Sequence, residues 1–209
     1  MILRKAFELF MRYGIKSVTM DDIARELGIS KKTLYQTVAN KADLIAQIFQ
    51  LHFAEEEQAM ATIREQSSDA IEEMLGIGRY VVEKTQGMSP TVVYDLQKYY
   101  RSLWDEMQAK MKKNVYSIII DNLERGIAQG LYRKDMQPDV VARLYVGKTV
   151  IAADEETFEA CNHDMSTLHR ELILYHMHGI TSAKGRQLLD KHLAAEARQE
   201  QTTIRKNPI

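Results

Sequence analysis

Cysteine, proline and long apolar runs are scarce in this sequence, and each scarcity excludes a class of protein. A single cysteine, Cys161, cannot form a disulfide within the chain, which excludes a disulfide-rich secreted scaffold and favours a reducing, cytoplasmic location. No apolar run approaches the roughly 18 to 20 residues that span a bilayer, so we expect no membrane partner. Only three prolines occur in 209 residues, and no segment alternates apolar and polar residues over strand length. The scarcity of proline and the lack of such alternation predict helices throughout.

The composition is that of an ordinary folded protein, but its charge is unevenly distributed. Apolar residues make up 45% and charged residues 27%, which excludes a disordered or collagen-like chain. Residues 1–52 hold eight Lys/Arg and five Asp/Glu, a net charge of +3, so the remainder must carry −4 of the total of −1. A basic N-terminal segment, residues 1–52, on an otherwise acidic chain suits a protein that binds a polyanion through this segment alone.

Apolar spacing and capping residues place the helices. The first should end near Tyr13, because Gly14 follows where a left-handed residue is usual. Thr19 and Ser30 can cap the second and third helices, and a fourth should begin at Lys41 and continue toward residue 70. Further helices are expected at about 69–85, 91–99, 101–129, 138–158, 165–179 and 182–200.

The second and third helices form a helix-turn-helix. They are joined by the short turn Gly28-Ile29-Ser30, and the third helix can enter a DNA major groove while the second crosses the backbone. Leu34 and Val38, four residues apart, should point into the core. The residues expected to meet base edges or phosphates are Thr19, Ser30, Lys31, Lys32, Thr33, Tyr35, Gln36 and Lys41.

This region resembles the DNA-binding domain of the TetR family of bacterial transcriptional regulators. The matching residues are Ile2-Leu3, Ala6, Phe10, Gly14, Thr19, Ile23-Ala24, Gly28-Ile29-Ser30, Thr33-Leu34-Tyr35, Asn40-Lys41 and Leu44. Thr37 and Val38 stand where the family usually has an aromatic pair, and Lys32 stands at a frequent glycine. The resemblance implies an all-α protein with an N-terminal three-helix helix-turn-helix domain, residues 1–46, and a C-terminal helical domain for effector binding and dimerisation, residues 47–209.

The C-terminal domain carries a set of soft apolar and aromatic side chains that could line a cavity for an apolar or aromatic effector of unknown identity. A filled core is the alternative for each of them. The candidate ligand-binding residues are Met74, Tyr100, Trp104, Met107, Met111, Tyr145 and Phe158.

A homodimer is expected, because one short recognition helix reads only a few base pairs and a two-fold pair reads a pseudo-palindromic site. The resemblance places the interface on the last two major helices, although a core position is an equal alternative for the leucines. The candidate interface residues are Val141, Leu144, Lys148, Leu168, Leu172, Tyr175 and His176.

We expect no catalytic residues, no metal site and no cofactor. The histidines His163, His169, His176 and His178 match no zinc-ligand spacing, and a structural or interfacial role is favoured for them. Cys161 beside His163 does not by itself make a nucleophilic site, because adjacency in sequence is not the spatial arrangement that such catalysis needs.

The sequence therefore predicts a DNA-binding transcriptional regulator whose partner is a double-stranded operator. By resemblance it is a repressor that a small ligand releases, with activation left open. Two alternatives remain: a helical small-molecule-binding protein or enzyme that has kept a degenerate DNA-binding head, and a regulator controlled by a protein partner without a small ligand.

Overall fold

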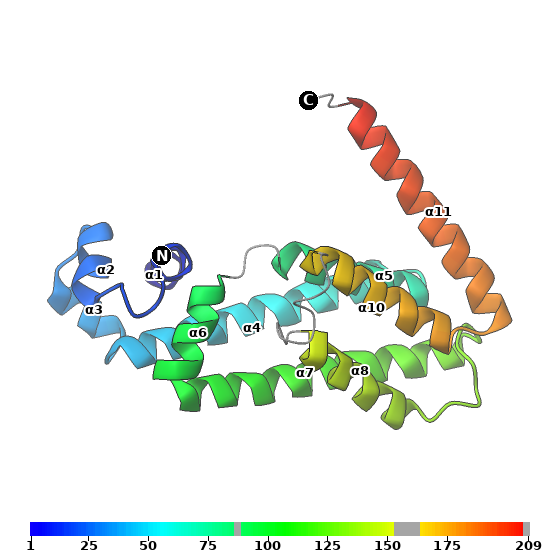
Figure 1. Ribbon diagram of the computed structural model, residues 1–209, viewed down its shortest axis with the longest axis horizontal. Helices are drawn as coiled ribbons and strands as arrows, with labels where there is room; N and C mark the ends of the chain where they lie inside the picture. The colour runs from blue at the N-terminus through cyan, green and yellow to red at the C-terminus, as the bar shows by residue number, and fades with distance from the viewer. Residues whose placement is uncertain (86–88, 153–163, 207–209) are drawn as a thin grey trace. The chain divides into compact units, whose positions relative to one another are not determined.

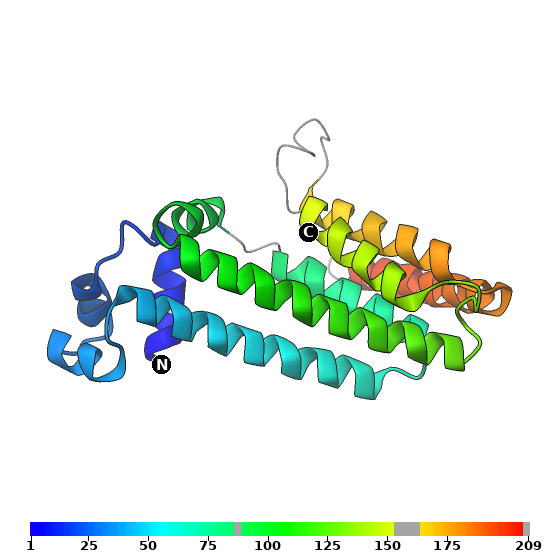
Figure 2. The same ribbon diagram turned by 90° about the horizontal axis from the view of Figure 1, so that it is seen from below.

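The fold is all-α, as the sequence predicted. The computed structural model describes residues 1–85, 89–152 and 164–206 (Figures 1 and 2). Among these residues the extended pairing is limited to one isolated bridge between Tyr132 and Thr181. The helices are α1 (Ile2–Tyr13), α2 (Met20–Glu26), α3 (Lys31–Thr37), α4 (Lys41–Gln66), α5 (Ala70–Thr85), α6 (Pro90–Tyr99), α7 (Arg101–Ala128), α8 (Pro138–Ala152), α10 (Met165–Ile180) and α11 (Ala183–Lys206).

These bounds confirm most of the expected helix limits. Gly14 follows α1 with a φ of 82°, a left-handed conformation that glycine adopts without a steric penalty. One difference occurs at the C-terminal end, where α11 continues to Lys206, beyond the expected end at residue 200. Helix α8 is described as far as Ala152, and residues 153–158 of the helix expected over 138–158 lie outside the described residues.

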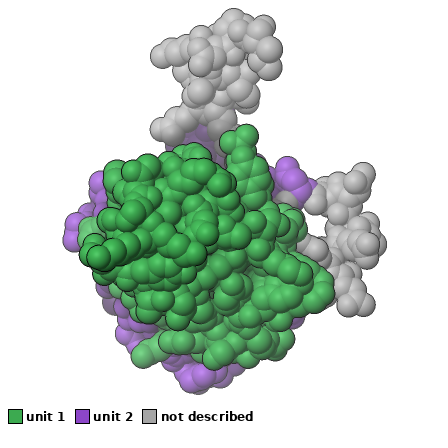
Figure 3. All heavy atoms as spheres, turned by 90° about the vertical axis from the view of Figure 1, so that its left-hand side faces the viewer, with its two compact units in different colours: residues 1–59, 87–113 green, residues 60–86, 114–209 purple. Residues whose placement is uncertain are grey.

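The chain divides into two compact units, which Figure 3 colours separately. Unit 1 comprises residues 1–59 and 87–113, and unit 2 comprises residues 60–86 and 114–209. The long helices α4 and α7 each have residues in both. The two units are defined by which residues contact one another, and they do not divide the functions of the chain. The assignment of DNA binding to residues 1–46 and of effector binding and dimerisation to residues 47–209 therefore stays a prediction.

The core of unit 1 joins the helix-turn-helix to α6. Its buried side chains include Phe10 from α1, Ile23 from α2 and Leu34 from α3, together with Val92 and Leu96 from α6. Helix α6 is 79 residues away in sequence from the α1–α2 connector, yet the Asp95 carboxylate accepts a hydrogen bond from the backbone N–H of Lys16 at 2.8 Å. Helix α6, which lies outside the predicted first domain of residues 1–46, therefore packs into the same core as the helix-turn-helix.

The core of unit 2 is built around α5, α7 and α10. Helices α5 and α10 lie side by side in both views (Figures 1 and 2). Buried polar groups within this core satisfy one another: the Arg125 guanidinium donates to Glu73 at 2.8 Å, and the Asn122 amide donates to Glu73 at 3.1 Å. Such pairing is what allows a carboxylate such as Glu73 to remain 3% exposed.

Candidate DNA-binding site

The recognition helix α3 has a polar outer face and an apolar inner anchor. Leu34 is fully buried and Val38 is 2% exposed, so the helix is fixed by its inner side. The five side chains of the opposite face are all exposed: Lys31, Lys32, Thr33, Tyr35 and Gln36. This arrangement is the one predicted from the sequence, and it presents donors and acceptors in the way that base-edge recognition in a major groove requires.

The hydroxyl groups of Thr19 and Ser30 are engaged in capping. Thr19 caps α2 with a reciprocal pair of bonds: its Oγ1 accepts from the Asp22 N–H at 3.1 Å, and its own N–H donates to the Asp22 carboxylate at 2.9 Å. Ser30 caps α3 by accepting from the Thr33 N–H at 3.0 Å. Both residues therefore fix the start of a helix, and the phosphate contacts expected of them stay a prediction.

Two predicted contact lysines differ in their surroundings. Lys31 forms an ion pair with Asp21 at 2.7 Å, and that hydrogen bond raises the pKa of Lys31. Both partners are more than half exposed, so the pair is weak and a DNA phosphate can replace Asp21. Lys41 opens α4 and is half-buried, with its Nζ 5.8 Å from the centre of the Phe10 ring, and this burial lowers its pKa.

The start of α4 carries a negative side chain, Asp43, close in sequence to the predicted phosphate contact Lys41. One Asp43 oxygen accepts the Ala39 N–H at 2.7 Å, and the Asp43 N–H in turn donates to the Asn40 side chain at 2.9 Å. Part of this helix terminus is therefore already satisfied by the protein. Lys41 is the positively charged residue there, and its contact with a phosphate stays a prediction.

Comparison with known proteins identifies the family of the N-terminal helix-turn-helix segment. Residues 2–48 match the family of bacterial regulatory proteins described as the tetR family. Residues 2–48 therefore form a TetR-family DNA-binding domain. The protein that carries this domain is a DNA-binding transcriptional regulator, and the curated relatives that it matches are HTH-type transcriptional regulators as well.

One relative and two solved structures extend the likeness to the rest of this regulator. YvaF, an uncharacterized HTH-type transcriptional regulator of Bacillus subtilis (strain 168), is 28% identical over 158 residues, which cover 74% of this chain and 80% of YvaF. A transcriptional regulator from Cytophaga hutchinsonii aligns with a TM-score of 0.70 at 17% identity, covering 87% of this chain and 97% of the other. A regulator from Saccharomonospora viridis, solved in complex with choline, aligns with a TM-score of 0.61 at 19% identity over 87% of this chain and 96% of its own. These two likenesses show that the fold of both units is shared with solved structures of transcriptional regulators.

The predicted ligand-binding residues of this regulator are divided between the two units. Tyr100, Trp104 and Met107 pack against the apolar cluster of unit 1. Met74 and Tyr145 lie in the core of unit 2, where they are 0% and 5% exposed. Met111 is half-buried in unit 1, and Phe158 lies outside the described residues. A shared ligand cavity for this set stays a prediction.

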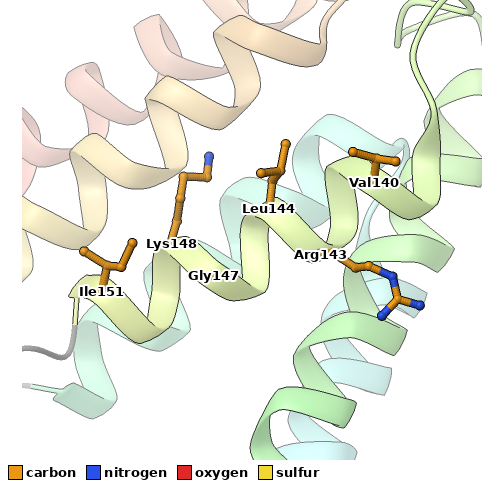
Figure 4. Close-up of a pocket in the computed structure, with 6 residues that line it drawn as sticks. All are labelled: Val140, Arg143, Leu144, Gly147, Lys148 and Ile151. Atoms are coloured by element: carbon orange, nitrogen blue, oxygen red, sulfur yellow. The ribbon is translucent and has the colours of Figure 1, made fainter.

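One of the predicted dimer residues, Leu144, belongs to an exposed apolar strip on α8. Val140, Leu144 and Ile151 are between 53% and 63% exposed, and with Arg143, Gly147 and Lys148 they line a shallow open depression (Figure 4). On α10, Tyr175 is 73% exposed, and the Lys148 ammonium lies 5.0 Å from the centre of its ring. Val141, Leu168 and Leu172 are half-buried.

His176, also predicted at the interface, is buried within its own chain. It is 4% exposed, and its ring meets that of Tyr145 edge-on with centroids 4.7 Å apart. Burial, with a further contribution from the charge of Lys148, lowers the pKa of His176 to about 3. Its Nε2 has no hydrogen-bond partner among the described residues. Cys161 and His163 lie outside those residues.

Two other kinds of site are absent from the described parts of the chain. No cluster of three or more His, Cys, Asp or Glu side chains is arranged to hold a metal ion there. No helix in those parts is both long enough and apolar enough to cross a membrane.

Proposed function

We propose that this regulator acts as a homodimeric repressor that a small apolar or aromatic ligand releases from its operator. The observation that carries the DNA-reading part is the exposure of Lys31, Lys32 and Gln36 on a helix whose opposite side is anchored by Leu34. In this role Gln36 reads base edges, while Lys41 and the start of α2 hold phosphates. A regulator of this kind works where the chromosome lies, so the proposal includes a cytoplasmic location.

The proposal of a homodimer is supported by the apolar strip on α8 and the neighbouring Tyr175. A large aromatic ring that is 73% exposed and a leucine that is 63% exposed are costly to leave in water, and a two-fold interface buries the same patch on both copies. In the dimer, Leu144 and Tyr175 make the apolar contacts, and Lys148 lies beside them.

Release by a ligand follows from a shift between two conformations. A ligand that prefers a conformation in which the two reading heads are wrongly spaced lowers the population able to bind DNA, and about 1.4 kcal/mol of preference lowers the affinity tenfold. We propose that the change travels along α4, which begins at Lys41 and has residues in both units. The complex of the Saccharomonospora viridis regulator with choline is consistent with small-molecule control in this fold.

A regulator controlled by a protein partner is the second candidate. It is favoured by the close packing of Met74 and Tyr145, since these predicted ligand contacts already fill the core of unit 2. Thermal unfolding in the presence of a small-molecule library separates the two candidates, because a ligand that binds only the folded state raises the melting temperature.

The DNA-binding part is tested on fragments selected from genomic DNA. Binding should weaken steeply as salt rises, and Lys41→Ala should weaken binding to all fragments by a similar factor because a phosphate contact carries no sequence information. Failure of the wild-type protein to retard any fragment at low salt would overturn the proposal.

The dimer is tested by sedimentation with two variants of the same charge change. Leu144→Asp should produce monomers, whereas Ser117→Asp, at an exposed position on α7 in the same unit, should leave the dimer intact. A monomeric wild type, or a dimer that survives Leu144→Asp, would contradict the proposed interface.

A further inference from the structure

A row of alternating lysines and tyrosines links the α1–α2 connector to α6 within unit 1. We call Lys16, Tyr94, Lys98 and Tyr99 the lysine–tyrosine row. The Lys16 ammonium donates to the Tyr99 hydroxyl at 2.8 Å, and the Lys98 ammonium donates to the Tyr94 hydroxyl at 2.5 Å. The Lys98 ammonium also lies 5.6 Å from the centre of the Tyr99 ring, which joins the two pairs into one surface.

This surface offers donors and almost no acceptors. In each pair the tyrosine oxygen already accepts a bond from an ammonium, so its own O–H is left to donate outward, as are the other N–H groups of the lysine. Tyr94 is 53% exposed and Tyr99 is 42% exposed, so these donors reach solvent. The bond from Lys16 also lowers the pKa of Tyr99, as expected for a hydroxyl held by a cation.

No carboxylate neutralises the row among the described residues. Neither Lys16 nor Lys98 forms an ion pair there, although surface lysines of the same unit such as Lys5 and Lys31 do. The one carboxylate of α6, Asp95, is 5% exposed and accepts the backbone N–H of Lys16. The charge of Asp95 is therefore buried in unit 1, and the exposed surface of the lysine–tyrosine row carries only the positive charges of Lys16 and Lys98.

The lysine–tyrosine row begins close to α2, the helix whose start holds a phosphate in the proposed function. Lys16 precedes Thr19, the cap of α2, by three residues, and three residues of extended chain span at most about 11 Å. Nucleotides rise by about 3.4 Å along each strand of a duplex, so the row lies within a few phosphates of the contact expected at α2.

We propose that the lysine–tyrosine row is a second contact with the DNA phosphate backbone, beyond the helix-turn-helix. It would grip the same operator duplex through Lys16, Lys98 and the two tyrosine hydroxyls, adding affinity without sequence preference. This inference rests on the proposed DNA binding and adds a part of α6 to its footprint.

The test uses single substitutions and a duplex of random sequence. Lys98→Gln removes a charge, and Tyr94→Phe removes a hydroxyl while keeping its ring. Lys112→Gln is the matched control, because Lys112 is an exposed lysine of unit 1 on α7 outside the row. Affinity for a fluorescein-labelled duplex of about 40 base pairs is measured as salt rises from about 50 to about 200 mM.

Lys98→Gln should weaken binding at low salt and reduce the slope of log K against log salt by about 0.9 for each phosphate that the variant no longer neutralises. Tyr94→Phe should weaken binding without changing the slope, since it removes a neutral donor. Lys112→Gln should behave as the wild type.

Two outcomes would overturn the inference, and they are distinguishable. If the wild type binds the duplex and Lys41→Ala weakens binding while Lys98→Gln matches Lys112→Gln, the row is no DNA contact and the proposed function stands. If the wild type does not bind the duplex even at low salt, the row and the proposed DNA binding both fail.

Discussion

The buried His176 should make the folded protein lose stability in mild acid. In the unfolded chain a histidine takes up a proton as the pH falls through about 6.5, whereas in the folded chain His176 stays neutral until about pH 3. Between these values the unfolded state binds more protons, so the free energy of unfolding falls as the pH falls. At about pH 5 this one residue should cost about 2 kcal/mol relative to neutral pH.

The magnitude follows from the surroundings of the ring. His176 is 4% exposed, it packs edge-on against Tyr145, and the Lys148 charge opposes its protonation, so little solvent screens the cost of charging it.

His176→Leu isolates this contribution. Urea unfolding followed by far-UV circular dichroism, at about pH 7.5 and about pH 5 and at one protein concentration, gives the pH-dependent loss for each protein. The loss should be smaller by about 2 kcal/mol in His176→Leu than in the wild type. His178→Leu, which removes an exposed histidine from the same helix, should keep the full loss because His176 remains. Equal losses in the wild type and His176→Leu would refute the burial argument.

Two further substitutions test the packing of each unit by urea unfolding. Thr19→Ala removes the capping box of α2 and should lower the free energy of unfolding by about 1 kcal/mol, whereas Thr37→Ala, at the exposed end of α3, should change it little; equal effects would refute the role of the cap. Gly126→Ala places a Cβ in steric overlap with the ring of the buried Tyr132 and should cost about 1 to 3 kcal/mol. Gly179→Ala is the control, because a Cβ at this helical position would meet no side chain and no backbone atom from outside its own stretch of helix within 4 Å, and it should be neutral or stabilising by up to about 1 kcal/mol. If Gly126→Ala costs no more than Gly179→Ala, the steric argument is wrong.

The helix limits could be predicted because the signals that set them are local. Thr19 and Ser30 bond to backbone groups three residues along the chain, and Gly14 takes its left-handed conformation within a single residue. The inner and outer faces of α3 follow in the same way from the spacing of Leu34 and Val38. Predictions of this kind need no knowledge of what the rest of the chain does.

The parts that could not be predicted depend on contacts between distant segments. Asp95 and Lys16 are 79 residues apart, and no periodicity in either segment indicates that they meet. Trp104 and Met107 were grouped with Met74 because all are soft apolar residues, yet they pack on the cluster of unit 1 while Met74 lies in unit 2. His176 was placed at a surface because its helix was expected there, and only the packing against Tyr145 reveals that it is buried.

The claim that α3 reads base edges as one half of a two-fold pair is tested most directly by selecting bound sequences from a random duplex pool with the wild type and with Gln36→Ala. The wild type should enrich a two-fold symmetric motif whose half-sites lie about one helical turn, or a multiple of it, apart. Gln36→Ala should enrich the same motif with relaxed preference at one position in each half-site, because Gln36 is exposed on the outer face of α3. Enrichment of no motif, or of one unchanged by Gln36→Ala, would contradict the account.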